Sequence, residues 1–140
     1  VFSLNNIIKK TNIDIFIHCK NDLKIKSHAG LYSQIITNLV LNSVRHAFTV
    51  NEKGRIDITV IVESGSLQII YEDNGKGIKK HILPKIFDPF FTTNRDYGGT
   101  GLGLNVIYNI VTSQLNGSIK CSSIEHGGVR FHILVAENIL

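Results

Sequence analysis

The chain has 140 residues, 43% of them hydrophobic and 19% charged, and a formal net charge of +4 at neutral pH. This length and balance suit one soluble globular domain with a single core. No apolar run approaches the roughly 18 residues that cross a bilayer, no signal segment opens the chain, and the basic residues lack interleaved aromatics, so we expect neither membrane contact nor nucleic-acid binding by this domain.

The first half of the chain predicts strands on either side of one long helix. Residues 31–48 form an apolar-periodic run that is too long for a strand and therefore favours a helix. Within this run, Ile36, Val40, Ser43, Val44 and Ala47 recur at helical spacing. A short helix is predicted at 3–10, and strands at 12–19, 22–27, 54–64 and 66–73, where the first two pair with each other and the last two form a hairpin.

The second half predicts glycine-rich loops, a second long helix and two closing strands. We expect a short helix at 78–86, a helix at 103–116 with Gly117 as its C-terminal cap, and strands at 117–124 and 127–135. The order of these elements predicts a two-layer α/β sandwich. Its sheet is mixed and mostly antiparallel, with about five strands and helices on one face.

The sulfur-containing residues indicate an excised, reduced domain. There is no methionine, not even at position 1, and we therefore expect a domain cut from a longer protein. Cys19 and Cys121 have neither the spacing of a metal site nor the density of a disulfide framework. We expect both to be reduced core or strand residues.

The glycines between positions 98 and 103 fit neither of the two common phosphate-binding patterns. A P-loop needs a lysine after its last glycine, but Leu104 follows Gly103. A dinucleotide fingerprint that began at Gly101 would need its third glycine where Val106 stands. Two interpretations stay open: Gly101 and Gly103 expose helix-start N–H groups to an anion, or they only allow a tight loop.

A polar stripe on the first long helix suggests a metal and phosphate site. Gln34, Asn38, Asn42, Arg45 and Thr49 recur at steps of three and four residues, so they share one helical face. An amide oxygen is a hard ligand that Mg²⁺ accepts together with substrate phosphates, and an arginine can bind a phosphate oxygen. The alternative is a solvated helix face.

The segment after the strand at 66–73 places an aspartate in a glycine turn. Asp73 and the following Asn74 and Gly75 are typical of a hairpin, but no alternating strand follows them. A carboxylate accepts hydrogen bonds only, so Asp73 would suit the exocyclic amino group of adenine. Gly75 and Gly77 would let the adenine ring lie against the backbone.

These segments, in this order, resemble the catalytic ATP-binding domain of a bacterial sensor histidine kinase. The wider superfamily, which shares the GHKL or Bergerat fold, includes DNA gyrase, a heat-shock chaperone and a mismatch-repair ATPase. The matching segments are the N box at 38–46, the first glycine box at 72–78, the F box at 86–93, the second glycine box at 98–104 and a closing glycine-strand element at 127–133. The resemblance covers nearly all of 1–140, which we expect to be one such domain without its dimerisation domain.

The resemblance implies that the chain binds ATP with Mg²⁺. Asn42 would hold the metal, supported by Asn38, and Arg45 would lie near the phosphates. The implied nucleotide-binding residues are Asp73, Gly75, Gly77, Ile78, Phe87, Phe90, Gly99, Thr100, Gly101, Leu102 and Gly103. Phe87, Phe90 and Phe91 would hinge and pack a lid over the nucleotide, and we expect at least one of them to be buried.

One position separates the kinases of this superfamily from its ATPases. The resemblance places Asn38 where the ATPases carry a glutamate that activates water, and an asparagine cannot take up that proton. The chain would then hold ATP while another nucleophile is brought in. Asn94 stands where close relatives carry a lysine, with Arg95 next, so one alternative is a regulatory nucleotide-binding module without catalysis. Because other members of the superfamily use similar boxes, a serine kinase or an ATPase is the further alternative.

The resemblance also implies partners that lie outside this chain. The phosphorylated histidine belongs to an upstream dimeric helical domain. No histidine here has an acceptor-like setting, and His46 is the one we expect nearest to phosphate, so the fragment alone should not autophosphorylate. The full-length protein is expected to be a homodimer that acts on a response regulator, with this domain in the cytoplasm and an anchor, where present, in the inner membrane.

Overall fold

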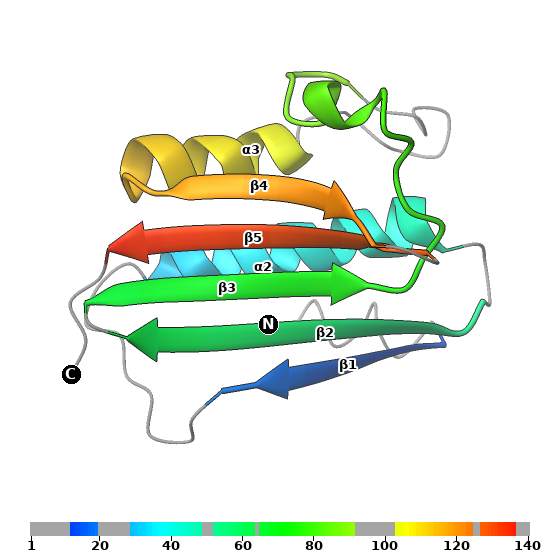
Figure 1. Cartoon of the computed structure of the whole chain (residues 1–140), viewed down its shortest axis with the longest axis horizontal. Helices are drawn as coiled ribbons and strands as arrows, with labels where there is room; N and C mark the ends of the chain where they lie inside the picture. Colours follow the sequence, from blue (N-terminus) through cyan, green and yellow to red (C-terminus); the bar gives the residue numbers. More distant parts are fainter. Residues whose placement is uncertain are drawn as a thin grey trace.

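The strands form one sheet. The computed structural model describes residues 12–19, 29–48, 52–63, 65–91, 103–124 and 127–136. Within these residues, five strands lie side by side in the order β1-β2-β3-β5-β4 (Figure 1). Their bounds are β1 (Ile13–His18), β2 (Gly54–Glu63), β3 (Ser66–Asp73), β4 (Ser118–Ser123) and β5 (Val129–Ala136).

The pairing of the strands confirms the mixed, mostly antiparallel sheet. β1 runs parallel to β2, and the other three neighbouring pairs are antiparallel. β2 and β3 form the predicted tight hairpin, in which Glu63 pairs with Ser66 and Gly65 takes a positive φ of 80°. The predicted strand at 22–27 and the predicted helix at 3–10 lie outside the described residues.

Both predicted long helices are present, and each widens to π-helical geometry before it ends. α2 (Ala29–Asn42) continues as the π-helical turn η1 (Ser43–Ala47), and α3 (Gly103–Asn109) continues as η4 (Ile110–Gln114). Such π-helical turns are common at functional sites. Where a short helix was predicted at 78–86, only the single 3₁₀ turn η2 (Leu83–Lys85) forms.

The cap of the second helix differs from the prediction by one residue. Asn116, with φ of 53°, takes the left-handed position that we assigned to Gly117. The N–H of Gly117 then donates to the carbonyl of Val111 at 2.7 Å, which closes the helix end. Gly117 is needed for a different reason, because a Cβ there would collide with the carbonyl oxygen of Leu134.

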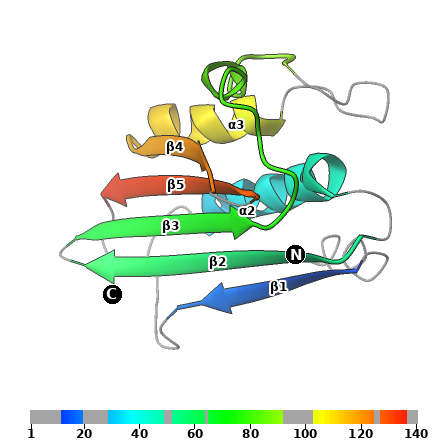
Figure 2. The same cartoon turned by 45° about the vertical axis from the view of Figure 1, so that its right-hand side comes forward.

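The core lies between the sheet and the two helices, which cover one face (Figures 1 and 2). Every second side chain of β3 and β5 is buried, as expected for strands with one covered face. The core positions of the central strands and the long helices include Leu67, Ile69, Tyr71, Phe131, Ile133, Ile35, Leu39, Ile107 and Val111. Asp73 ends this row on β3 and is the one charged residue that is buried among those described.

The two cysteines differ in setting. Cys121 lies in β4, as predicted, and is half-buried. Cys19 is exposed one residue past the end of β1, so the prediction of a core or strand residue is wrong there. Both are free thiols. In the described part of the chain, no helix is long and apolar enough to span a membrane.

Candidate functional site

A pocket of about 760 Å³ opens beside the end of β3. Its walls come from α2 and η1, the segment that follows β3, the start of α3 and the facing ends of β4 and β5. The predicted site residues that line it are Asn38, Asn42, Arg45, Asp73, Gly77, Ile78 and Gly103, together with Phe91 of the predicted lid. The fold therefore brings three residues of the polar helix stripe and the aspartate turn to one cavity, whereas Gln34 of that stripe is exposed and does not line the pocket.

Other predicted residues lie outside this lining. Gly75 packs against the end of η1, where a Cβ would stand only 2.5 Å from the carbonyl oxygen of Ala47. Phe87 stacks on Tyr108 with ring centroids 5.3 Å apart, and Phe90 is 60% exposed with a positive φ. Gly99, Thr100, Gly101 and Leu102 lie outside the described residues, as do Thr49, Asn94 and Arg95.

The prediction that one of the three F-box phenylalanines is buried is wrong. Phe87 and Phe91 are only half-buried, although both pack against the core cluster. The buried residue of this segment is Ile86, which is 4% exposed. Ile86 directly follows the 3₁₀ turn η2, whereas Phe87 packs edge-on against Phe131 of the core and stacks on the partly exposed Tyr108.

Asp73 is held at the pocket wall by hydrogen bonds to both of its carboxylate oxygens. Ser43 Oγ donates to Oδ2 at 2.8 Å, and the backbone N–H of Gly75 donates to Oδ1 at 3.0 Å. The residue is only 3% exposed. A buried carboxylate without such donors would be strongly unfavourable, so these two bonds allow the charge to stay at this position.

Two buried hydroxyl groups extend this network into the core. Tyr71 OH lies 2.6 Å from Ser43 Oγ and 3.0 Å from the carbonyl oxygen of Leu39. The two hydroxyls have two protons for three contacts. The Ser43 proton goes to Asp73, because the carboxylate is the strongest acceptor, and the Tyr71 proton is shared between Ser43 Oγ and the Leu39 carbonyl.

Burial raises the pKa values of three side chains near this network. Burial raises the pKa of Asp73, and the hydrogen bonds from Ser43 and from the Gly75 and Val129 backbone oppose that rise. Burial, together with the Asp73 charge, also raises the pKa of Tyr71, which therefore keeps its proton. The same two causes raise the pKa of Cys121 to about 12, so this cysteine stays a neutral thiol.

Basic side chains form another part of the pocket wall. Arg45, His46, Lys76 and Lys79 line it, whereas Asp73 is the one acid among its described lining residues. Burial, followed by the charges of Lys76 and Arg45, lowers the pKa of His46, so its ring is neutral at neutral pH. The pocket can therefore hold an anion beside these cations and a hydrogen-bond donor beside Asp73.

Ser43 and Lys76 are not among the site residues predicted from the sequence. Ser43 enters that prediction only as one of several residues at helical spacing. A hydroxyl that recurs with apolar residues needs a partner when it is buried, and that requirement was the available signal. Lys76 stands between the two glycines of the aspartate turn, so its place beside the pocket could have been inferred from theirs. His46 lines the pocket, as its predicted proximity to the site requires.

The chain resembles proteins of known family. Over residues 28–139 it matches the family described as histidine kinase-, DNA gyrase B-, and HSP90-like ATPase. Sensor histidine kinase ZraS of Escherichia coli O157:H7 is 36% identical over 116 residues, which cover 83% of this chain and 24% of that protein. The chain thus spans about a quarter of this relative's length.

Solved structures show the same fold. The catalytic domain of histidine kinase ThkA, in a nucleotide-free form, is 31% identical, with a TM-score of 0.79 over 97% of this chain and 88% of that one. A structure of ThkA in complex with response regulator protein TrrA is 26% identical, with a TM-score of 0.77 over 98% of this chain and 38% of that one.

We predict that Ser43→Ala destabilises the protein more at neutral pH than at acid pH. Loss of the hydroxyl leaves Asp73 with one donor fewer, which costs about 1–3 kcal/mol. The lost bond favoured the ionised carboxylate, so the pKa of Asp73 rises further, and the folded variant loses additional stability as pH rises through that pKa. Urea unfolding at about pH 4 and about pH 7 measures both effects.

Ser123→Ala is the matched control for this prediction. The Ser123 hydroxyl donates to the carbonyl oxygen of Ile78 at 2.6 Å and has no charged partner. Its removal should therefore cost the same free energy of unfolding at both pH values. If Ser43→Ala behaved like this control, the hydroxyl would have no role in holding the Asp73 charge.

Proposed function

Because this chain belongs to the family of histidine kinase-, DNA gyrase B- and HSP90-like ATPases and is a catalytic domain of the sensor histidine kinase type, we propose that it binds Mg-ATP and donates the γ-phosphoryl group to a histidine on a separate domain. The observation that carries this proposal is the buried Asp73 carboxylate in a pocket that also presents Asn42 and Arg45. Such a transfer is a step of two-component signalling.

The setting of Asp73 supports recognition of adenine. The carboxylate already accepts from Ser43 and Gly75, yet it lines the pocket and keeps acceptor capacity toward it. The amino group of adenine would donate there, whereas the carbonyl of guanine at the same position would face the carboxylate with an acceptor. Gly77 and Ile78 would line the space for the ring.

The donor set of the pocket fits a metal that arrives with phosphates. Asn42 and Asn38 offer half-buried amide groups at the pocket, and the described residues contain no cluster of three histidine, cysteine or acidic side chains. Asn42 would hold Mg²⁺ through its amide oxygen, with Asn38 beside it on the preceding helical turn. Bound Mg²⁺ would neutralise charge on the phosphates during transfer.

The absence of a suitable base in the described lining favours transfer over hydrolysis. Asn38 cannot take a proton from water, and in this proposal the Asp73 carboxylate faces the adenine amino group and not the phosphates. His46 is neutral, but burial and the neighbouring cations lower its pKa and make it a weak base. The chain's residues would thus bind and orient ATP, and the attacking group would come from elsewhere.

We place the remaining functions of the sensor kinase outside this chain. The matched part makes up 24% of its ZraS relative, so most of that protein lies outside the match. In this proposal the present chain is the ATP-binding catalytic domain. The acceptor histidine, the dimer contacts and any membrane anchor would belong to the rest of a cytoplasm-facing protein, and the response regulator would receive the phosphoryl group from that assembly.

The proposed transfer is tested by mixing this domain with a separately produced acceptor domain and ATP labelled at the γ-phosphate. We expect acid-labile label on an acceptor histidine, and none on this chain when it is incubated alone. Asn42→Ala should reduce the transfer strongly. Nucleotide binding without any label on the acceptor would indicate a regulatory module, acid-stable label a serine kinase, and release of inorganic phosphate alone an ATPase.

The cationic part of the pocket gives a second prediction. Lys76 and Lys80 are both exposed, but Lys76 lines the pocket and Lys80, four residues later, does not. Lys76→Gln should weaken Mg-ATP binding about fivefold, the size of one partly solvated charge contact, and Lys80→Gln should leave it unchanged although it removes the same charge. Calorimetric titration measures both. Equal losses in the two variants would mean that only the net charge matters.

A further inference from the structure

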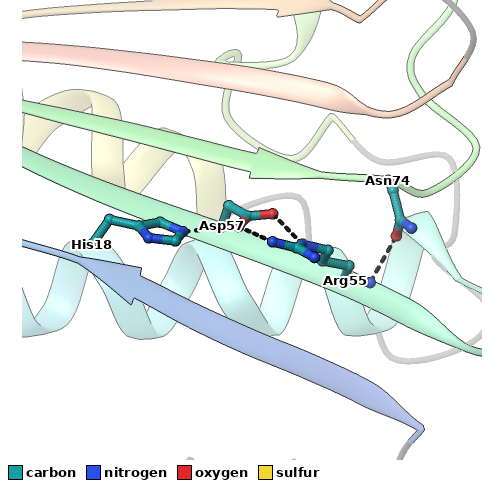
Figure 3. Close-up of polar contacts among 4 residues, drawn as sticks. All are labelled: His18, Arg55, Asp57 and Asn74. Carbon is teal, nitrogen blue, oxygen red and sulfur yellow. Dashed lines mark hydrogen bonds and ion pairs between the residues drawn. The ribbon is translucent and has the colours of Figure 1, made fainter.

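Asn74 ties the turn that follows Asp73 to the neighbouring strand. Its backbone N–H donates to the carbonyl oxygen of Arg55 at 3.1 Å, and its side-chain Oδ1 accepts from the backbone N–H of Arg55 at 2.7 Å (Figure 3). Asn74 is exposed and lies outside the pocket lining. Any influence on the pocket must therefore act through the turn.

The side chain of Asn74 takes the place of a backbone carbonyl. In the antiparallel register of β2 and β3, Ile56 pairs with Asp73, so Arg55 and Asn74 would form the next pair. The backbone N–H of Asn74 makes its expected bond, but Oδ1 replaces its carbonyl oxygen as the acceptor. The sheet pairing thus continues for one residue while the main chain is free to turn away.

Arg55, the partner of Asn74 on β2, has its side chain fixed on the face of the sheet that the helices do not cover. Its guanidinium donates to both carboxylate oxygens of Asp57, at 2.8 and 3.0 Å, and lies 4.2 Å above the ring of Phe16. His18 donates to the same carboxylate at 3.0 Å (Figure 3). These contacts join β1 to β2 at the residue that holds Asn74. Their individual energies are small, because the groups are partly exposed.

The turn is held from its other side as well. The backbone N–H of Lys76 donates to the carbonyl oxygen of Ala47 at the end of η1, at 3.0 Å. Between these two anchors, the N–H of Gly75 donates to Asp73 Oδ1. Release of Asn74 from Arg55 would let the peptide before Gly75 rotate, and the bond that orients the Asp73 carboxylate would be lost.

We propose that Asn74 is a positioning residue for base selectivity. By replacing a backbone carbonyl in the β2–β3 ladder, its side chain holds the turn in the one conformation in which Gly75 orients the Asp73 carboxylate. This inference rests on the proposed binding of ATP. It adds that selectivity for adenine depends on a residue that does not touch the nucleotide.

The test compares Asn74→Ala with Asn74→Asp. Alanine removes the side-chain acceptor, whereas aspartate keeps an oxygen at the same place. Calorimetric titration with Mg-ATP and Mg-GTP gives the ratio of the two affinities, which a simple loss of stability does not move, since both nucleotides bind the same folded molecules. We expect Asn74→Ala to lower the preference for ATP about tenfold and Asn74→Asp to restore it.

Gln68→Ala is the matched control on the same face of the sheet. Its Oε1 accepts from His132 Nε2 at 2.9 Å, a bond between β3 and β5 away from the turn, and its loss should leave the ratio unchanged. If Asn74→Ala folds poorly, Asn74→Ser, whose side chain is too short to reach Arg55, serves instead. If the ratio of the two affinities is unchanged in Asn74→Ala or in Asn74→Ser, the inference about Asn74 is overturned but the proposed function is not. A wild-type chain that does not prefer ATP overturns the proposed function with it.

Discussion

The arrangement of the site depends on the burial of one carboxylate. Asp73 closes the row of buried side chains on β3, so its charge lies where the core would otherwise continue. A charge in that position is tolerated only with donors that the fold supplies in advance. The Ser43 hydroxyl on η1 is one such donor, and the backbone N–H of Gly75 in the turn is another. The helix, the strand end and the turn are therefore fixed relative to one another by a single side chain.

The same network joins the site to the core. Tyr71 packs edge-on against Phe131 with ring centroids 6.2 Å apart, while its hydroxyl contacts Ser43 and the α2 backbone. No buried side-chain polar atom of the described residues lacks a hydrogen-bond partner. A fully satisfied buried network of this kind specifies one arrangement of its elements, which suits a pocket that must present a carboxylate in a fixed direction.

Local patterns in the sequence predicted most of the fold and part of the site. Alternation identified the described strands, and helical spacing placed Asn38, Asn42 and Arg45 on the face that lines the pocket. The role of Ser43 could not be read in this way, because its partner is thirty residues away in sequence. Burial in the F-box segment also depends on tertiary packing: Ile86 is buried in the core, whereas Phe87 and Phe91 pack against it only in part.

The proposed contact between Asp73 and the amino group of adenine can be measured directly with a thermodynamic cycle. Affinities would be determined for Mg-ATP and for the triphosphate of purine riboside, which lacks the amino group, with the wild-type chain and with Asp73→Ala. We expect that loss of the amino group weakens binding to the wild type about tenfold or more and changes binding to the variant little. Equal losses in both proteins would contradict it.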